Sequence, residues 1–210
     1  EVFIYTKSIG KQAEMHAETT AYNRETSPQT FQVEWTVLNR EKKVIATHKS
    51  ANATFAPNEK LTVKSNFNIP NAQLWDTENP YLYTLITKIT ANGKTTDLIH
   101  TRFGVRTFSY QPDGFYLNNK KMKIKGVCVH QDHAGVGTAL LDELQYYRVG
   151  LLKAMGANAY RTAHHPHSPV VLQACDSLGL LVMDETRLLN SGREYRQQFE
   201  DLIKRDRNHA

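Results

Sequence analysis

The first half of the chain alternates apolar and polar residues with a period of two, the pattern of strands that bury one face. Residues 31–37 and 81–89 show this alternation most clearly. Asn92-Gly93 follows the second segment and supplies the residue pair that a tight hairpin turn prefers, so residues 96–106 are predicted as the returning strand.

About seven such strands in one hundred-odd residues are typical of a sandwich. Residues 1–107 are therefore predicted to form an immunoglobulin-like β-sandwich domain, although the paired cysteines of antibody domains are absent. Its Trp35 and the nearby Trp75 are interpreted as packing residues of a core or domain boundary rather than as a sugar-stacking platform.

From residue 108 onward the pattern changes to strands that alternate with helices. Strands are predicted at residues 121–130, 157–163 and 180–186, the last one apolar enough to be covered on both faces. A helix is predicted after each strand. The second helix has the clearest ends, because Ser168 and Pro169 suit its start and Gly179 suits its stop.

The other two helices are predicted from their apolar stripes. In residues 142–156 the stripe contains Leu144, Tyr147, Leu151, Leu152 and Met155. In the last helix Tyr195, Phe199, Leu202 and Ile203 share a face. Ser191 and Glu194 have the spacing of a capping box and are predicted to open this last helix.

The order β-α-β-α-β-α over residues 108–210 predicts the first three units of a TIM (β/α)₈ barrel. A complete barrel needs roughly 250 residues, so this part is expected to be truncated and the fold class is β plus α/β. Three strands alone would leave the faces that close a barrel uncovered. We therefore expect marginal stability or association in this region.

Charge and composition indicate an ordinary globular protein with no nucleic-acid partner. The formal net charge is +5, but residues 1–107 carry 13 Lys/Arg against 10 Asp/Glu, and residues 108–210 carry 13 against 11. Neither half is a basic arm. The nearest approach to a basic patch is KKMKIK at residues 120–125, which is interpreted as one solvated strand face.

No apolar run approaches the roughly 20 residues that span a bilayer, so no membrane partner is predicted. The N-terminal residues lack the zones of a signal peptide, and the sequence is expected to start inside a strand, which leaves a periplasmic or cytoplasmic location open. Cys128 and Cys175 lie in apolar segments and are predicted to be buried free thiols. The oligomeric state is left open.

Polar side chains follow each of the three predicted barrel strands. His130, Asp132 and His133 follow the first, Arg161 and the histidines of RTAHHPHSP end the second, and Asp184 with Glu185 ends the third. The carboxyl ends of barrel strands face the active-site mouth. These residues are therefore predicted to converge at one site.

Six sequence blocks resemble consecutive blocks of glycoside hydrolase family 2, the β-galactosidase and β-glucuronidase group. They are LWDTENPYLYTL, FGVRTF, DGFYLNNKKMKIKGVCVHQDH, NAYRTAHHPHSP, LVMDETRLLNSG and KRDRNH, in order from about residue 70. The resemblance implies an immunoglobulin-like domain followed by the start of a catalytic barrel. It also implies that the acid/base and nucleophile glutamates lie beyond Ala210, so this chain alone is expected to be inactive.

The resemblance also implies roles for single residues. His164 matches a histidine that contacts the sugar, Asp132 matches a carboxylate that reaches sugar hydroxyls in some members, and His130 matches a recurrent histidine of the mouth. Arg161 and Glu185 match positions that support the catalytic carboxylates, and Asp184 is interpreted as a further supporting residue. The remaining histidines, His133, His165 and His167, are interpreted as rim residues.

The implied function is that of a retaining glycosidase acting on β-galactosides, since Arg187-Leu188-Leu189 resembles the galactosidase branch. A β-glucuronidase or another β-glycosidase of the family is the alternative. Metal-dependent members carry a carboxylate four residues after the equivalent of Glu185 and a histidine six residues after it. This chain has Leu189 and Ser191 there, so no metal site and no cofactor are predicted.

Two functions of other classes stay open on the residues alone. A metal-dependent barrel hydrolase would use HQDH at residues 130–133 and HHPH at residues 164–167 as ligands, because zinc favours several nitrogen or oxygen donors around an open position. A non-catalytic carbohydrate- or protein-binding module would use the sandwich.

Overall fold

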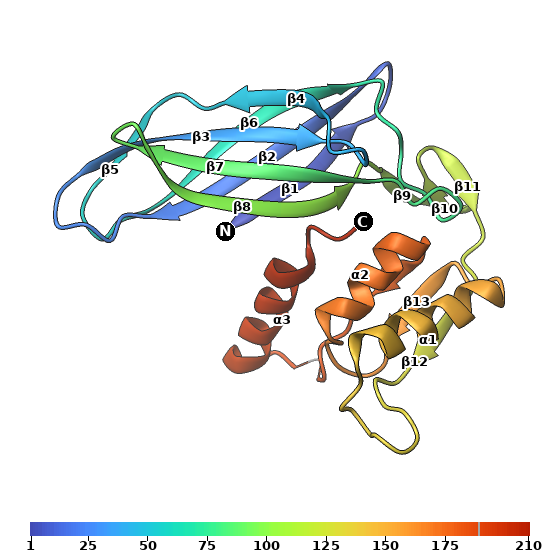
Figure 1. Ribbon diagram of the computed structural model, residues 1–210. Coiled ribbons are helices and arrows are strands. Elements are labelled where there is room, and N and C mark those ends of the chain that lie inside the picture. The colour runs from blue at the N-terminus through green and yellow to red at the C-terminus, as the bar shows by residue number, and fades with distance from the viewer. Residues whose placement is uncertain (189) are drawn as a thin grey trace. The chain divides into compact units, whose positions relative to one another are not determined.

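The computed structural model describes residues 1–188 and 190–210. The chain divides into two compact units. Residues 1–74 and 81–107 form the first unit, and residues 75–80 join residues 108–210 in the second. Figure 1 draws both units, and each is described by itself.

The first unit is a β-sandwich of two antiparallel sheets, as predicted (Figure 1). One sheet has the strand order β1-β2-β6, and the other has the order β4-β3-β7-β8 with β5 paired to β3. The strands are β1 (Val2–Ser8), β2 (Gln12–Tyr22), β3 (Gln29–Leu38), β4 (Val44–Lys49), β5 (Ala53–Phe55), β6 (Lys60–Pro70), β7 (Leu82–Ala91) and β8 (Lys94–Gly104).

The alternating residues of the sequence form the core of the sandwich. Every second side chain of β3 and β7 is buried, including Trp35, whose indole nitrogen donates a hydrogen bond of 2.9 Å to Thr19 Oγ1. Asn92 and Gly93 form the predicted turn between β7 and β8 with φ angles of 50° and 73°. The period-two prediction is thus confirmed for this unit.

The second unit begins with a small antiparallel sheet that the sequence analysis did not predict. Its strands are β9 (Phe108–Gln111), β10 (Gly114–Leu117) and β11 (Lys120–Met122). The single strand predicted at residues 121–130 is wrong, because β11 ends at Met122 and β12 starts at Gly126 in another sheet. The Asn158 side chain holds the connection, since it binds the Lys125 N–H at 2.7 Å and the Lys123 carbonyl at 2.9 Å.

Three strands and three helices then alternate in the predicted order (Figure 1). They are β12 (Gly126–Val129), α1 (Asp142–Ala154), β13 (Ala159–Thr162), α2 (Pro169–Leu178), β14 (Leu181–Met183) and α3 (Arg193–Asp206). The three strands are parallel in the order β12-β13-β14, with Cys128 opposite Arg161 and Arg161 opposite Met183. The start of a barrel is therefore confirmed.

The helix faces differ from the predicted ones. In α1 Gln145 and Val149 are buried, whereas Tyr147 and Met155 are 62% and 73% exposed. In α3 Leu202 is buried and Phe199 and Ile203 are largely exposed. Apolar periodicity identified these helices but not their packed sides, because the packed side depends on which neighbour the connecting loop brings close.

Two local predictions are corrected. The N-cap of α3 is Gly192 with no side-chain cap, so Ser191 and Glu194 do not form a capping box. Cys175 is buried but Cys128 is exposed, although both thiols are free. Cys128 and Met183 occupy the face of the parallel sheet that no described helix covers, and Met183 is 65% exposed. The prediction that the strand of residues 180–186 is covered on both faces is therefore wrong here.

The carboxyl end of α2 is fastened to residues 75–80. Gly179 takes the left-handed conformation with φ 78°, and Trp75, which is fully buried, donates its indole N–H to the Asp176 carbonyl at 2.8 Å. The Lys153 ammonium group binds the carbonyls of Thr77 and Gly179. This contact set explains why residues 75–80 group with the second unit. No helix among the described residues is long and apolar enough to cross a membrane.

We predict that Gly179→Ala lowers the free energy of unfolding by more than about 1 kcal/mol, because it adds a Cβ at a positive φ. That Cβ would overlap the backbone of Thr77. Urea denaturation of the purified chain, followed by circular dichroism, measures the effect.

The matched control is Gly150→Ala in α1, where an added Cβ meets open space. This substitution should raise the free energy of unfolding by about 0.5–1 kcal/mol through helix propensity. Equal effects of the two substitutions would contradict the role assigned to Gly179.

Candidate functional site

The carboxyl ends of β12, β13 and β14 lie at one edge of the parallel sheet. His130 directly follows β12, Arg161 lies near the end of β13, His164 comes two residues after that strand, and Glu185 comes two residues after β14. Parallel pairing brings these residues together although the first and last are far apart in sequence.

Glu185 is the acceptor at the centre of this edge. Its Oε1 atom receives hydrogen bonds from two guanidinium nitrogens of Arg161, one of them at 2.9 Å. Its Oε2 atom lies 3.3 Å from His164 Nδ1. The Arg161 guanidinium holds the pKa of Glu185 below its usual range, with a smaller contribution from His164 and against the opposing effect of burial.

His164 also meets the end of β12. Its ring centroid lies 5.4 Å from that of His130 in an edge-on arrangement, while Arg148 donates a hydrogen bond of 2.8 Å to the His130 carbonyl. His164 has 62% of its side chain exposed, so its ring can reach a bound molecule. The structure thus groups His130, His164, Arg161 and Glu185.

Asp132 is an exposed residue of the same loop, and no hydrogen bond joins its carboxylate to the residues that the structure describes. Its neighbour His133 forms a backbone bridge with Gly137. The predicted contact of Asp132 with sugar hydroxyls therefore stays a prediction.

Asp184 lies beside the group but faces the interior. Its Oδ1 atom accepts hydrogen bonds from the Thr162 hydroxyl at 2.9 Å and from the Glu185 N–H at 3.1 Å. Burial and, after it, the nearby Asp206 carboxyl raise the pKa of Asp184 to about 6. The pKa values of the neighbouring Asp184 and Glu185 carboxyl groups are thus shifted in opposite directions.

His167 is a buried residue and does not belong to the rim, so that interpretation is wrong. Its Nδ1 atom lies 3.0 Å from the Tyr160 hydroxyl, and its Nε2 atom has no hydrogen-bond partner within the described parts of the chain. Burial lowers the pKa of His167 to about 4 and raises that of Tyr160. Only the place of His167 directly before Ser168 and α2 hinted at burial.

Two further residues, which were not predicted from the sequence, contact this group. Cys128 lies on the open face of the sheet, and an Arg161 guanidinium N–H points to its sulfur at 3.5 Å. Thr162 receives the Glu185 N–H at 2.8 Å while it donates to Asp184. Both are strand residues whose sequence pattern is that of a core, so no local signal marked them.

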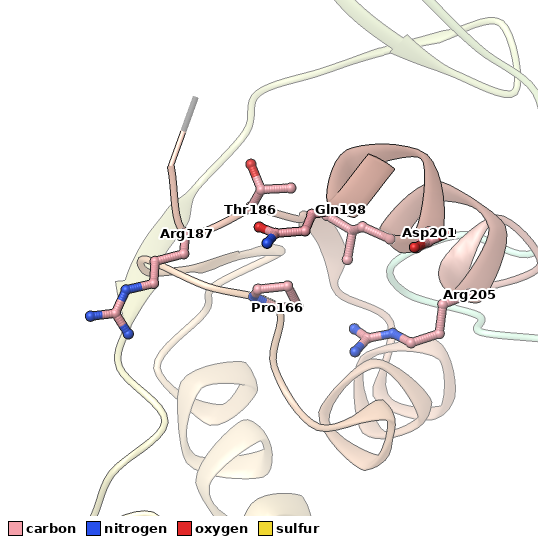
Figure 2. A pocket seen from close by; sticks show the side chains of 7 residues that line it. Pro166, Thr186, Arg187, Gln198, Asp201 and Arg205 are labelled. Atoms are coloured by element: carbon pink, nitrogen blue, oxygen red, sulfur yellow. The ribbon is translucent and has the colours of Figure 1, made fainter. Parts of the chain in front are cut away.

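A pocket of about 320 Å³ lies next to this edge (Figure 2). Its walls come from the loops after β13 and β14 and from α3: Pro166, Thr186, Arg187, Gln198, Asp201, Leu202 and Arg205. Arg205 reaches from α3 toward the loop of Pro166, whereas Arg187 points away from α3 (Figure 2). Arg205 donates a hydrogen bond of 3.0 Å to the His167 carbonyl.

Within residues 1–188 and 190–210 no group of three or more histidine, cysteine, aspartate or glutamate side chains is placed to hold a metal ion. HQDH and HHPH therefore gain no support as a zinc site. Of the two positions compared with the metal ligands of metal-dependent members, Ser191 lies in the same connection between β14 and α3 as Glu185, and Leu189 lies outside the described residues.

Comparison with known proteins decides the family. The model described as "Glycosyl hydrolases family 2" matches residues 1–106, and the model described as "Glycosyl hydrolases family 2, TIM barrel domain" matches residues 109–206. The chain belongs to glycosyl hydrolase family 2. The resemblance and the fold class stated from the sequence are thereby confirmed.

Curated relatives in glycosyl hydrolase family 2 have two kinds of name. Beta-galactosidase BoGH2A of Bacteroides ovatus is 34% identical over 221 residues, which cover 99% of this chain and 26% of that protein. Beta-glucuronidase of Mus musculus is 31% identical over 194 residues, which cover 85% of this chain and 28% of that protein. The chain thus spans about a quarter of the length of these relatives.

Solved structures of the family agree with this fold. A glycosyl hydrolase family 2 member from Bacteroides cellulosilyticus matches with a TM-score of 0.92 at 29% identity, over 99% of this chain and 28% of that one. The Bacteroides uniformis beta-glucuronidase matches with a TM-score of 0.88 at 27% identity, over 99% of this chain and 26% of that one.

We predict that His167 makes the stability of this family 2 chain fall as the solution becomes acidic. The pKa of His167 is lower in the folded chain than in the unfolded chain, so the unfolded chain takes up the proton more readily. The contribution of His167 to stability is therefore complete above pH 6.5 and is lost as the pH falls through about 4. Against His167→Phe, which cannot take up this proton, the wild type should lose about 2–3 kcal/mol of unfolding free energy between pH 7 and pH 4.

Urea denaturation of both forms across this pH range measures the difference. The NMR signal of the His167 ring gives a direct second measurement. A ring that titrates near pH 6.5 would show that His167 is not held neutral by burial.

Proposed function

We propose that this chain forms part of the sugar-binding edge of a retaining glycoside hydrolase that acts on β-galactosides. The observation that carries the proposal is the group of His164, His130, Arg161 and Glu185 at the carboxyl edge of three parallel strands, in a chain of glycosyl hydrolase family 2. In barrels this edge is where substrates bind.

The chemistry of the group fits a binding and supporting role. A retaining glycosidase uses two carboxyl groups about 5–5.5 Å apart, one as nucleophile and one as acid and then base. Glu185 is paired with Arg161 and has a lowered pKa, so it is poorly suited to donate a proton as an acid. The exposed His164 ring, fixed by Glu185, is suited to hold a sugar hydroxyl.

The catalytic glutamates are assigned to the longer protein. The resemblance seen in the sequence supports a position for both of them after Ala210, and the chain spans about a quarter of the length of its curated relatives. We therefore assign hydrolysis to the longer protein and substrate positioning to these residues. The 210-residue chain alone is expected to be inactive.

β-Galactosides are the preferred substrate class in this proposal. The Arg187-Leu188 segment after Glu185 resembles the galactosidase branch, and Beta-galactosidase BoGH2A matches over 99% of this chain. Relatives named beta-glucuronidase match as well, over 85% of this chain for the Mus musculus protein and over 99% for the Bacteroides uniformis structure. β-Glucuronides are accordingly the competing substrate in the test.

The longer protein should hydrolyse an aryl β-galactoside with retention of configuration, and the 210-residue chain should show no turnover. Rates on aryl β-galactoside and aryl β-glucuronide, with NMR of the first sugar product, measure this. Faster turnover of the glucuronide would overturn the substrate class, and turnover by the short chain would overturn the placement of the catalytic groups.

In the longer protein His164→Ala should lower kcat and kcat/KM together by about 10²-fold or more, because a contact that strengthens at the transition state acts on the chemical step. Steady-state kinetics on the aryl β-galactoside measure both constants. The matched control is His100→Ala, which removes an exposed histidine of β8 in the sandwich. A His164→Ala enzyme that changes only KM would remove His164 from the transition-state contacts.

A further inference from the structure

One oxygen of Asp184 is buried without a donor. Oδ1 of this carboxyl group is satisfied by the Thr162 hydroxyl and the Glu185 N–H, as described above. Oδ2 is inaccessible to solvent and receives no hydrogen bond from a donor within the described residues. A buried carboxylate oxygen without a donor is costly, so this oxygen calls for a proton or a partner.

A second carboxyl group lies beside the Asp184 side chain. Asp206, at the end of α3, lies within hydrogen-bonding reach of Asp184, and its side chain is only 9% exposed. Arg205 donates hydrogen bonds to the Asp206 carboxylate, at 2.8 and 3.0 Å from Nε and at 2.7 Å from a terminal nitrogen. Neither carboxylate can donate to the other unless one of them carries a proton.

We propose that Asp184 is held as a neutral carboxylic acid that donates its proton to the Asp206 carboxylate, and that this acid–carboxylate pair positions Glu185. The arrangement gives each polar atom a partner. Asp206 keeps its negative charge beside the Arg205 guanidinium, and Asp184 supplies the one proton that the pair shares. Asp184 is thus a positioning residue that acts through Glu185.

The hydrogen-bonded chain runs from α3 to the site. Arg205 binds Asp206, Asp206 meets Asp184, and Asp184 together with Thr162 binds the backbone N–H of Glu185. Glu185 in turn binds Arg161 and His164. Arg205 also ties α3 to the His167 carbonyl and extends toward the loop of Pro166 (Figure 2).

The charges around Asp184 support its neutral form. Asp206 from α3 disfavours a second negative charge, Arg205 is engaged by Asp206, and Arg161 from β13 is engaged by Glu185. The raised pKa of about 6 sets the range of this form: Asp184 carries the shared proton below about pH 6 and loses it above that pH. With a raised pKa, the stabilising contribution of Asp184 is complete below about pH 3.8 and is lost as the pH rises through about 6.

The test compares the wild type with Asp184→Asn, whose amide donates to Asp206 and accepts from Thr162 as the neutral acid does. At pH 4 the two forms should unfold at the same temperature. At pH 8 the variant should unfold about 5 °C or more higher, because it has no proton to lose. Asp201→Asn, an exposed carboxylate of α3 that binds Gln197, is the matched control and should show no such pH-dependent gain.

A gain at pH 8 that is absent at pH 4 supports the shared proton, and a variant less stable than the wild type at pH 8 overturns it. A second measurement does not depend on any variant folding. In the wild type the carboxyl carbon of Asp184 should titrate near pH 6 in NMR, and a midpoint below about 4.5 overturns the proposal.

The link to Glu185 rests on the proposed function and has its own experiment. In the longer protein, Asp184→Ala should lower kcat/KM on the aryl β-galactoside by about tenfold or more, because Glu185 loses its support. At pH 5, where Asp184 carries its proton, Asp184→Asn should stay within about twofold of the wild type. Equal losses in both variants overturn the positioning role. A wild-type protein without glycosidase activity would refute the proposed function. The stability and NMR results would still show whether Asp184 carries the proton shared with Asp206.

Discussion

Parallel pairing of β12, β13 and β14 is the constraint on which the rest of the candidate site depends. It sends the chain out of all three strands at the same edge of the sheet. His130, His164 and Glu185 meet there although His164 lies 34 positions after His130 and Glu185 lies 21 positions after His164. The helices that connect the strands cover one face of the sheet and leave the face of Cys128 and Arg161 open to the site.

Two neighbouring carboxyl groups at this edge differ in charge because their surroundings differ. Glu185 faces Arg161 and His164, which favour its charged form, whereas Asp184 points into the interior beside Asp206, which disfavours a second charge. One residue therefore presents a fixed negative charge to the open side. The other can serve as a neutral link to α3, and this division arises from neighbours rather than from residue type.

Specific contacts also hold the carboxyl end of α2. Gly179 ends α2 in a conformation that suits glycine, Trp75 binds the last turn of that helix, and the Asp176 carboxylate receives His209 Nδ1 at 2.5 Å and the Ala210 N–H at 2.8 Å. Segments from residues 75–80 and from the end of the chain are thus held on one helix. Trp75 and His209 lie in blocks that resemble glycosyl hydrolase family 2, to which the chain belongs, whereas Asp176 and Gly179 lie between two of those blocks.

The sequence by itself determined the period-two sandwich, the parallel β-α order and the residues at the strand ends, because apolar periodicity and strand order are local properties. Only the tertiary structure decided which face of α1 is buried, that β11 and β12 are separate strands, and that Cys128 is exposed while His167 is not. It also decided that Asp184 meets Asp206. Such features depend on which distant segment covers a side chain, and no local pattern contains that information.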